Sequence, residues 1–297
     1  MSPEQEIAAA AELDRSGFLP LPGESAPAFL ARFQQSEETF ARFEEELKEA
    51  GSARVFDEFQ VSESDRIPLK VMEEAAGKTR ALYGFENRRV PGFFLSGKVG
   101  ALWGGCMIGD PDNGFAVMLL RSSFRERAKW YIYERAELVA HELCHAMRQS
   151  LGDVKLEEYF AYQTSSSFLR RTFGNCFIRE LDAILFILPA LLLLGVTVLR
   201  EFGRMSFPLW PFWLLAGVYP VFLLVRNFLS VRVVRRAEKK LRGFGVETPR
   251  AVLFRATFEE LRALGALKSA DDFQNFLHVM REKELRWAIM WINFFNR

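Results

Sequence analysis

The chain has 297 residues, with 39 Lys and Arg against 38 Asp and Glu, so its net charge argues against general nucleic-acid binding. The three cysteines are odd in number, widely spaced and without a C-x-x-C pair, which excludes a disulfide framework and favours a reducing compartment. Apolar residues make up 49% of the sequence and 29 residues are Phe, which is unusual for a soluble enzyme and indicates buried helices, lipid contact or both.

Residues 1–85 are expected to form an N-terminal helical region. The first 17 residues are acidic and lack the long apolar run of a signal peptide. Residues 27–50 place apolar side chains at helical spacing and end before Gly51, a residue type that commonly stops a helix. A further helix is predicted for residues 64–82.

The pattern changes over residues 86–180, which we interpret as a catalytic core. The Gly-rich residues 90–109 predict one or two strands with tight turns, and residues 115–121, FAVMLLR, predict another strand. A long helix is predicted for residues 122–151, with its stop at Gly152. Asp153 is a good N-cap for the helix that follows.

Residues 141–145 read His-Glu-Leu-Cys-His, an H-E-x-x-H pattern that uses two of the three histidines in the chain. On a helix, His141 and His145 lie one turn apart on the same face, where two imidazoles can bind one zinc ion. Glu142 is then placed to act as general base toward a metal-bound water and as acid toward the leaving amine. The simpler interpretation is two satisfied histidines and a surface carboxylate on a helix face.

A catalytic zinc site needs a third protein ligand. If the helix after Gly152 packs antiparallel to the motif helix, the rise of the two helices returns Glu157 and Glu158 to about the level of His145. Either carboxylate could then complete the site. Otherwise they are a solvated pair that favours a helix start.

H-E-x-x-H followed by Glu158-Tyr159-Phe160-Ala161, an E-x-x-A pattern, resembles the gluzincin group of metallopeptidases. In combination with apolar spans it resembles the integral-membrane gluzincins, such as the prenyl-protein endopeptidases and the heat-shock membrane proteases. The resemblance covers residues 140–162 and lies at the level of the clan. It implies one Zn²⁺ per chain, Glu158 as the third ligand with Glu157 as second choice, and a zincin-like core, in which an edge strand can hold a substrate backbone.

Other residues on the motif helix are candidates for supporting roles. Glu134, Glu137 and Arg148 fall on the same helical stripe as the two histidines, by steps of three and four residues. One of them could orient a histidine, as carboxylates and their partners often do at metal sites. An ordinary salt bridge to another helix is the alternative.

Four more side chains are candidates of a weaker kind. Tyr159 and Tyr162 could donate to a tetrahedral oxyanion, although plain packing is the simpler role. His278 lies on an amphipathic C-terminal helix and could serve the transition state if that region folds over the site; a structural or surface role is the alternative. Cys144, inside the motif, is expected to be a small apolar core residue.

Residues 181–199 and 207–225 are two apolar stretches, each long enough to cross ~30 Å of hydrocarbon, and they predict a transmembrane hairpin over residues 181–230. Ten Arg and Lys residues flank the hairpin and two lie in its connecting loop, which predicts a two-pass protein with both termini and the H-E-x-x-H motif in the cytoplasm. Residues 231–297 are expected to form a C-terminal helical cytoplasmic region. A buried core hairpin is the alternative.

The sequence thus predicts a mainly α fold with a small β-sheet, in which an α+β zincin-like core is joined to a two-helix transmembrane hairpin. The predicted function is that of a membrane-anchored zinc metalloendopeptidase that cuts peptides or membrane proteins at the cytoplasmic face. One alternative is a non-catalytic membrane-bound interaction or scaffold protein with a structural or vestigial metal site. Another is a metal-dependent hydrolase of substrates other than peptides. No nucleic-acid partner is expected.

Overall fold

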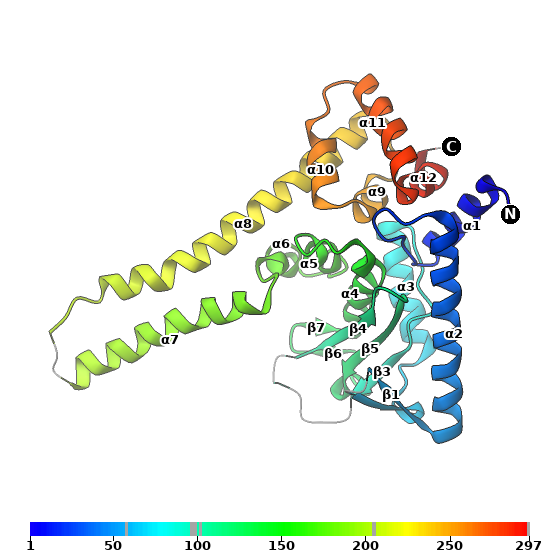
Figure 1. Ribbon diagram of the computed structural model, residues 1–297. Helices are drawn as coiled ribbons and strands as arrows, with labels where there is room; N and C mark the ends of the chain where they lie inside the picture. The colour runs from blue at the N-terminus through cyan, green and yellow to red at the C-terminus, as the bar shows by residue number, and fades with distance from the viewer. Residues whose placement is uncertain (57–58, 96–99, 101–102, 204–205, 296–297) are drawn as a thin grey trace.

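The chain is mainly helical and carries its strands in small sheets, as the sequence predicts. The computed structural model describes residues 1–56, 59–95, 100, 103–203 and 206–295. Figure 1 shows a body of helices packed around small sheets, from which two long helices project to one side.

The N-terminal region is helical except for one short hairpin. Its helices are α1 (Pro3–Arg15), α2 (Ala26–Ala50) and α3 (Leu69–Tyr83), and the hairpin consists of β1 (Ser52–Val55) and β2 (Phe59–Ser62). Gly51 ends α2 in the left-handed conformation, with φ of +69°, as expected for a glycine stop. The helix predicted from residue 64 begins only at Leu69, because the backbone N–H of Ile67 pairs with the carbonyl of Gly92 in the sheet.

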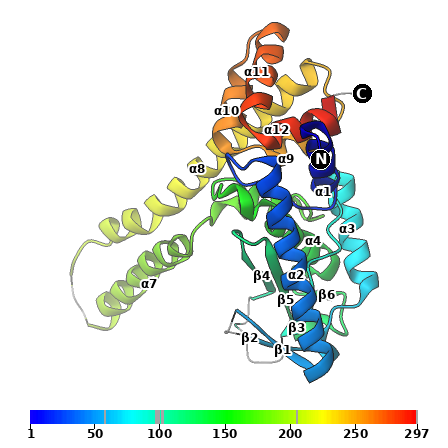
Figure 2. The same cartoon turned by 45° about the vertical axis from the view of Figure 1, so that its right-hand side comes forward.

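A three-stranded sheet forms the centre of the body. Its strands are β3 (Gly92–Leu95), β4 (Gly105–Asp110) and β5 (Phe115–Arg121), in the order β3–β5–β4. The middle strand, β5, runs parallel to β3 and antiparallel to β4. Because of this order, β4 lies at one edge of the sheet. The strand residues alternate between two buried faces, one packed against α3 and α4 (Arg135–Arg148) and the other against α2 and β1. Figure 2 shows α2 crossing one face of this sheet.

The prediction of one helix over residues 122–151 was wrong for the first half of that range. Residues before Arg135 instead form a turn and the hairpin of β6 (Lys129–Trp130) and β7 (Tyr133–Glu134). Aromatic side chains favour strands, and the rings of Trp130 and Tyr133 stack across this hairpin. Tyr131 has a φ of +52° in the tight turn, which no α-helix accommodates. The helix α4 ends at Arg148 and passes through one 3-10 turn to Gly152, the predicted stop.

The sequence predicts Asp153 as the N-cap of the next helix, but in the structure it does not cap that helix. The helix α5 (Glu157–Tyr162) starts later, and the Asp153 carboxylate instead accepts hydrogen bonds from the backbone N–H of Phe258 at 2.8 Å and from Arg148 at 3.4 Å. The chain reversal still produces the expected antiparallel arrangement. Glu157 and Glu158, at the start of α5, lie beside His145, and Tyr162 at its end lies beside His141.

Two helices are long and apolar enough to cross a membrane. They are α7 (Glu180–Phe202) and α8 (Trp210–Gly243), which pack against each other and project from the body (Figure 1). Only 11% and 17% of their most apolar windows is buried, whereas the core hairpin of a soluble protein would be mostly buried. The helix α8 continues well beyond residue 225 and connects the apolar stretch directly to the C-terminal helices.

The C-terminal region is helical, as predicted. It comprises α9 (Pro249–Arg255), α10 (Phe258–Ala266), α11 (Ala270–Lys283) and α12 (Leu285–Met290). The first and last parts of the chain meet here, since α1 packs on α12 and Arg255 pairs with Asp14 at 2.7 Å. The short helix α6 (Phe168–Phe173) comes before α7 in the chain and packs on α5.

Candidate metal centre

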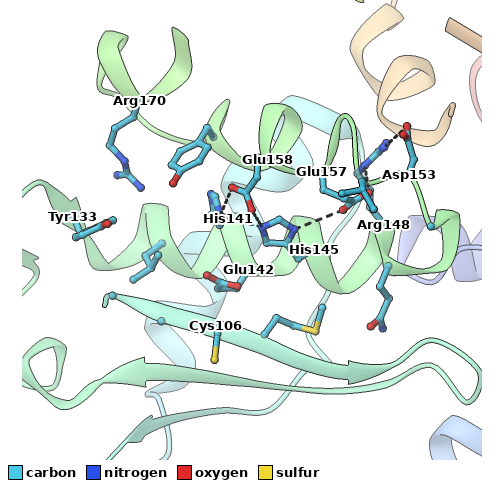
Figure 3. A pocket seen from close by; sticks show the side chains of 18 residues that line it. Cys106, Tyr133, His141, Glu142, His145, Arg148, Asp153, Glu157, Glu158 and Arg170 are labelled. Carbon is cyan, nitrogen blue, oxygen red and sulfur yellow. Dashed lines mark hydrogen bonds and ion pairs between the residues drawn. The ribbon is translucent and has the colours of Figure 1, made fainter. Parts of the chain in front are cut away.

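The helix α4 brings the two motif histidines together on one face. The Nε2 atoms of His141 and His145 lie 3.1 Å apart, so both rings point the same nitrogen at one spot (Figure 3). On other faces of the helix, Val139, Leu143 and Cys144 are buried in the core, which fixes the rotation of α4. Cys144 is fully buried, as expected for a core residue.

Glu158 on α5 supplies the third potential ligand. Its carboxylate oxygens lie 3.6 Å from Nε2 of His141 and 3.4 Å from Nε2 of His145. Three ligands on a tetrahedral ion with bonds of ~2.0–2.1 Å must stand about 3.3 Å apart, by simple geometry. The distances of 3.1, 3.4 and 3.6 Å are close to that value, with the last two measured to different oxygens of Glu158. One ligand atom from each of the three residues lies within 4.8 Å of the other two, so this group could hold a metal ion.

Glu157 takes a different position from its neighbour. One of its oxygens lies 3.6 Å from Nδ1 of His145, the ring nitrogen that faces away from the other ligands. Its second oxygen accepts a hydrogen bond from Nε of Arg148 at 3.1 Å. Glu157 is therefore placed to orient His145, with Arg148 holding Glu157 in turn.

The two histidines differ in charge preference. Burial, followed by the nearby His145 and Arg170, holds the pKa of His141 well below its usual range, so this ring is neutral and ready to act as a ligand. Burial would also lower the pKa of His145, but the carboxylates of Glu157, Glu158 and Glu142 outweigh it and raise that pKa to about 10. Three acids around one imidazole provide the negative surroundings that a divalent cation requires.

Glu142 lies beside the candidate ligands with its side chain buried. Burial is the main cause that raises its pKa to about 7, and the negative charge of Glu158 adds to it. A hydrogen bond from the backbone of Met107 on β4 acts in the opposite direction. A carboxyl group with a pKa near neutrality can both accept and return a proton, which is what a general base and acid must do.

These side chains line a cavity of about 570 Å³. Its floor is the motif face of α4, one wall is α5, and the other wall is the edge strand β4 with the residues just before it (Figure 3). The residues that line it, besides the ligands and Glu142, include Gly105, Cys106, Met107, Tyr133, Tyr162 and Arg170. An extended chain placed in this cavity would lie between β4 and the candidate ligands.

Of the two tyrosines that the sequence suggested as oxyanion donors, Tyr159 and Tyr162, only Tyr162 lines the cavity. Its ring centroid lies 4.6 Å from that of His141 in an edge-on arrangement. The Tyr162 ring packs directly against Gly174, where an added Cβ atom would lie 2.1 Å from the ring. Tyr159 does not line this cavity and packs instead against the core formed with the C-terminal helices.

The acids on the stripe of α4 do not touch the histidines. Glu137 accepts hydrogen bonds from the Ser165 hydroxyl at 2.9 Å and the Ser166 backbone at 2.7 Å, and pairs with Arg170 at 3.5 Å. Glu134 pairs with Lys129 at 3.7 Å. Glu137 thus ties α4 to the loop before α6, and of the stripe only Arg148 acts toward a histidine.

His278 is far from this arrangement. It is exposed on α11, lies 3.5 Å from Glu282 and does not line the cavity. Two residues that do line the cavity, Tyr133 and Arg170, had no signal in the sequence. Arg170 lies 25 residues after His145 in the chain and reaches the site only because the loop after α5 folds back.

No known protein family, no curated protein and no solved structure matches this chain. The site must therefore be interpreted from its own residues.

Proposed function

We propose that the protein is a membrane-anchored zinc-dependent metalloendopeptidase with a gluzincin-like site. The observation that supports this most is the convergence of His141, His145 and Glu158, whose potential ligand atoms lie within 4.8 Å of one another, with buried Glu142 beside them. Two imidazoles and one carboxylate form a donor set typical of catalytic zinc, which keeps a position open for water.

Each residue has a role in peptide hydrolysis. Bound zinc supplies a Lewis acid that polarises the scissile carbonyl and acidifies the attacking water. Glu142 accepts the proton of that water and delivers it to the leaving amine, for which a pKa of about 7 is suited. Glu157 fixes the orientation of His145, and Tyr162 faces the cavity, where its hydroxyl can donate to a developing oxyanion.

The strand β4 favours a polypeptide substrate. It is an edge strand, and it forms the wall of the cavity opposite α5. An extended peptide can pair with the outer edge of such a strand and so present its backbone to the candidate ligands. The position of an edge strand beside a motif helix supports the zincin-like interpretation of the core.

The hairpin of α7 and α8 serves as the membrane anchor in this proposal. The excess of basic residues at its base over those in its loop favours cytoplasmic termini and a cytoplasmic site. An anchor holds the site near membrane proteins and membrane-proximal peptides, which are the proposed substrates.

The test compares the wild-type chain, purified in detergent, with Glu142→Gln. We expect about one zinc per chain in both, and a loss of peptide hydrolysis of roughly 10²–10⁴-fold in the variant, the usual contribution of a general base. Glu134→Gln is the matched control, because Glu134 lies at the end of β7, just before the motif helix, and pairs with Lys129 at 3.7 Å instead of lining the cavity. Elemental analysis measures the metal, and mass spectrometry of a mixed peptide library measures cleavage.

Two results would reject the proposal. Wild-type protein that binds no divalent metal has no metal centre of this kind. Protein that binds zinc but shows no turnover dependent on Glu142 fits a scaffold with a structural metal.

A further inference from the structure

Exposed apolar side chains of the body gather in two segments. More than half of those that the described residues carry outside α7 and α8 lie at the turn of the β6–β7 hairpin, on α6, or between α6 and α7. We call these residues the apolar rim: Tyr131, Ile132, Phe168, Leu169, Phe173 and Phe177. Tyr131 is 82% exposed and Phe168 is 69% exposed. A soluble protein rarely leaves such a group uncovered.

The two segments of the rim belong to one surface. Arg170 of α6 extends over the rings of Tyr133 and Tyr162, with its guanidinium carbon 4.9 and 5.4 Å from their centroids. The same side chain pairs with buried Glu137 at 3.5 Å, so α6 is fixed beside β7. Tyr133 and Arg170 also line the candidate metal cavity (Figure 3), and the rim therefore borders one end of that cavity.

The rim is continuous with the apolar surface of α7. Phe177 contacts Phe186 of α7, with ring centroids 5.5 Å apart. Arg171 and Arg179 are interspersed with the rim residues, as cations are where apolar side chains dip into a bilayer and basic groups meet its headgroups. In Figure 1 the β6–β7 hairpin and α6 lie toward the side of the body from which α7 and α8 project. A lipid surface covers both the rim and α7, whereas a protein bound to the rim would leave α7 uncovered.

We infer that the apolar rim is seated in the interface of the bilayer that α7 and α8 cross, so that the end of the cavity lined by Tyr133 and Arg170 lies at the lipid surface. The cavity then admits a polypeptide segment at the point where that segment leaves the membrane. The lipid contact is inferred from the exposed side chains and their continuity with α7, independently of metal binding and of activity. The substrate class rests on the proposed peptidase function.

Fluorescence quenching tests the lipid contact without reference to metal or activity. An environment-sensitive fluorophore is attached to a cysteine introduced at Ile132 or Leu169, in full-length protein with Cys106→Ser, because the other two cysteines are buried. The protein is placed in nanodiscs of phosphatidylcholine and phosphatidylglycerol that carry a nitroxide on the upper acyl chain. A probe seated ~5–10 Å into the interface should lose more than about half of its fluorescence.

The matched control is the same probe at Val279, an exposed apolar residue on α11 at the other end of the body, where no quenching is expected. Equal quenching at Val279 and at the two rim positions would overturn the lipid contact. Probes at Ile132 and Leu169 that are shielded from water yet unquenched would overturn it too, and would indicate a second copy of the chain or another protein on the rim.

Cleavage of two matched peptides tests the substrate class. One is soluble, and the other carries the same sequence directly after a transmembrane anchor in the same bilayer. We expect Leu169→Ser to slow cleavage of the anchored peptide roughly tenfold. This is about the factor by which loss of one leucine side chain from the lipid interface should weaken seating of the rim in the bilayer. Cleavage of the soluble peptide should not change, and Val279→Ser should alter neither.

The outcomes separate the two proposals. If the wild-type chain cleaves neither peptide, the proposed function fails while the quenching result still decides the lipid contact. If it cleaves both and Leu169→Ser affects them equally, the peptidase stands and the inferred substrate class is wrong.

Discussion

His141 and His145 are identical residues one helical turn apart, yet their surroundings give them opposite proton affinities. The buried ring of His141 has Arg170 nearby, whereas His145 is surrounded by three carboxylates. Two opposing effects explain the difference. Burial disfavours the charged form of a ring and lowers its pKa, whereas adjacent negative charge favours the charged form and raises its pKa. A site that holds one neutral and one protonated imidazole must lose a proton when a metal binds both.

This difference predicts proton release on zinc binding. The pKa of His145 is raised to about 10, so its charged form stabilises the metal-free fold fully below pH ~6.5 and less as the pH rises toward 10. At pH 8 zinc should therefore displace about one proton from this ring, and the apparent affinity for zinc should rise by up to about tenfold per pH unit. Calorimetric titration in buffers of different ionisation enthalpy measures the release.

Glu157→Gln provides the comparison for this prediction. The variant keeps the three candidate ligands but removes the carboxylate beside Nδ1 of His145, so the pKa of His145 should fall. Proton release at pH 9 should be smaller than in the wild type, and zinc affinity should drop roughly 10–100-fold, as for other partners of metal ligands. Unchanged release and affinity would show that Glu157 does not orient His145.

At the scale of elements, the features that could be predicted from the sequence are those that depend on the spacing of residue types along the chain. The motif helix, the stop at Gly152, the antiparallel return of α5 and the two apolar helices all follow from spacing along the chain. The choice between Glu157 and Glu158 did not, because adjacent residues on a helix point about 100° apart and only packing decides which one faces both histidines. The β6–β7 hairpin was missed since Arg, Glu and Ala around Trp130 suit a helix, and only the tertiary contacts of its aromatic rings favour strands.

The packing of Tyr162 between α5 and the turn after α6 supplies a prediction at this scale. Gly174→Ala would place a Cβ atom 2.1 Å from the Tyr162 ring, so the ring must move, and with it the contact to His141. We expect a loss of about 1–3 kcal/mol in the free energy of unfolding, as for other overpacked sites, together with weaker zinc binding. Urea unfolding and zinc titration measure the two effects.

Gly77→Ala is the matched control for this change. Gly77 lies inside α3, and a Cβ atom there would meet nothing within 4 Å. The alanine should raise stability by roughly 0.5–1 kcal/mol through helix propensity and leave zinc binding unchanged. A Gly174→Ala protein as stable as the wild type would mean that Tyr162 is not wedged against this turn.

At the scale of the whole molecule, the ends of the chain support the site. Arg255 of α9 pairs with Asp14 of α1 and donates to the carbonyl of Tyr83, whose hydroxyl donates to the carbonyl of Phe160 in α5. Arg148, which holds Glu157, donates to the carbonyl of Phe254. This role of the C-terminal helices could not be predicted from the sequence, because it consists of contacts between residues more than a hundred positions apart.

The pair of Arg255 and Asp14 tests how strongly the fold depends on this closure. Both side chains are completely buried, so Arg255→Met leaves a buried carboxylate without its cation and should cost about 3–5 kcal/mol in the free energy of unfolding. Adding Asp14→Leu removes that charge and should restore a large part of the loss, since a buried ion pair is often replaced by apolar residues at little cost. Urea unfolding of the full chain in detergent, followed by tryptophan fluorescence, measures both. A double variant less stable than Arg255→Met alone would contradict this reasoning, and would indicate that Asp14 acts mainly through Asn293, whose side-chain amide donates to it at 2.9 Å.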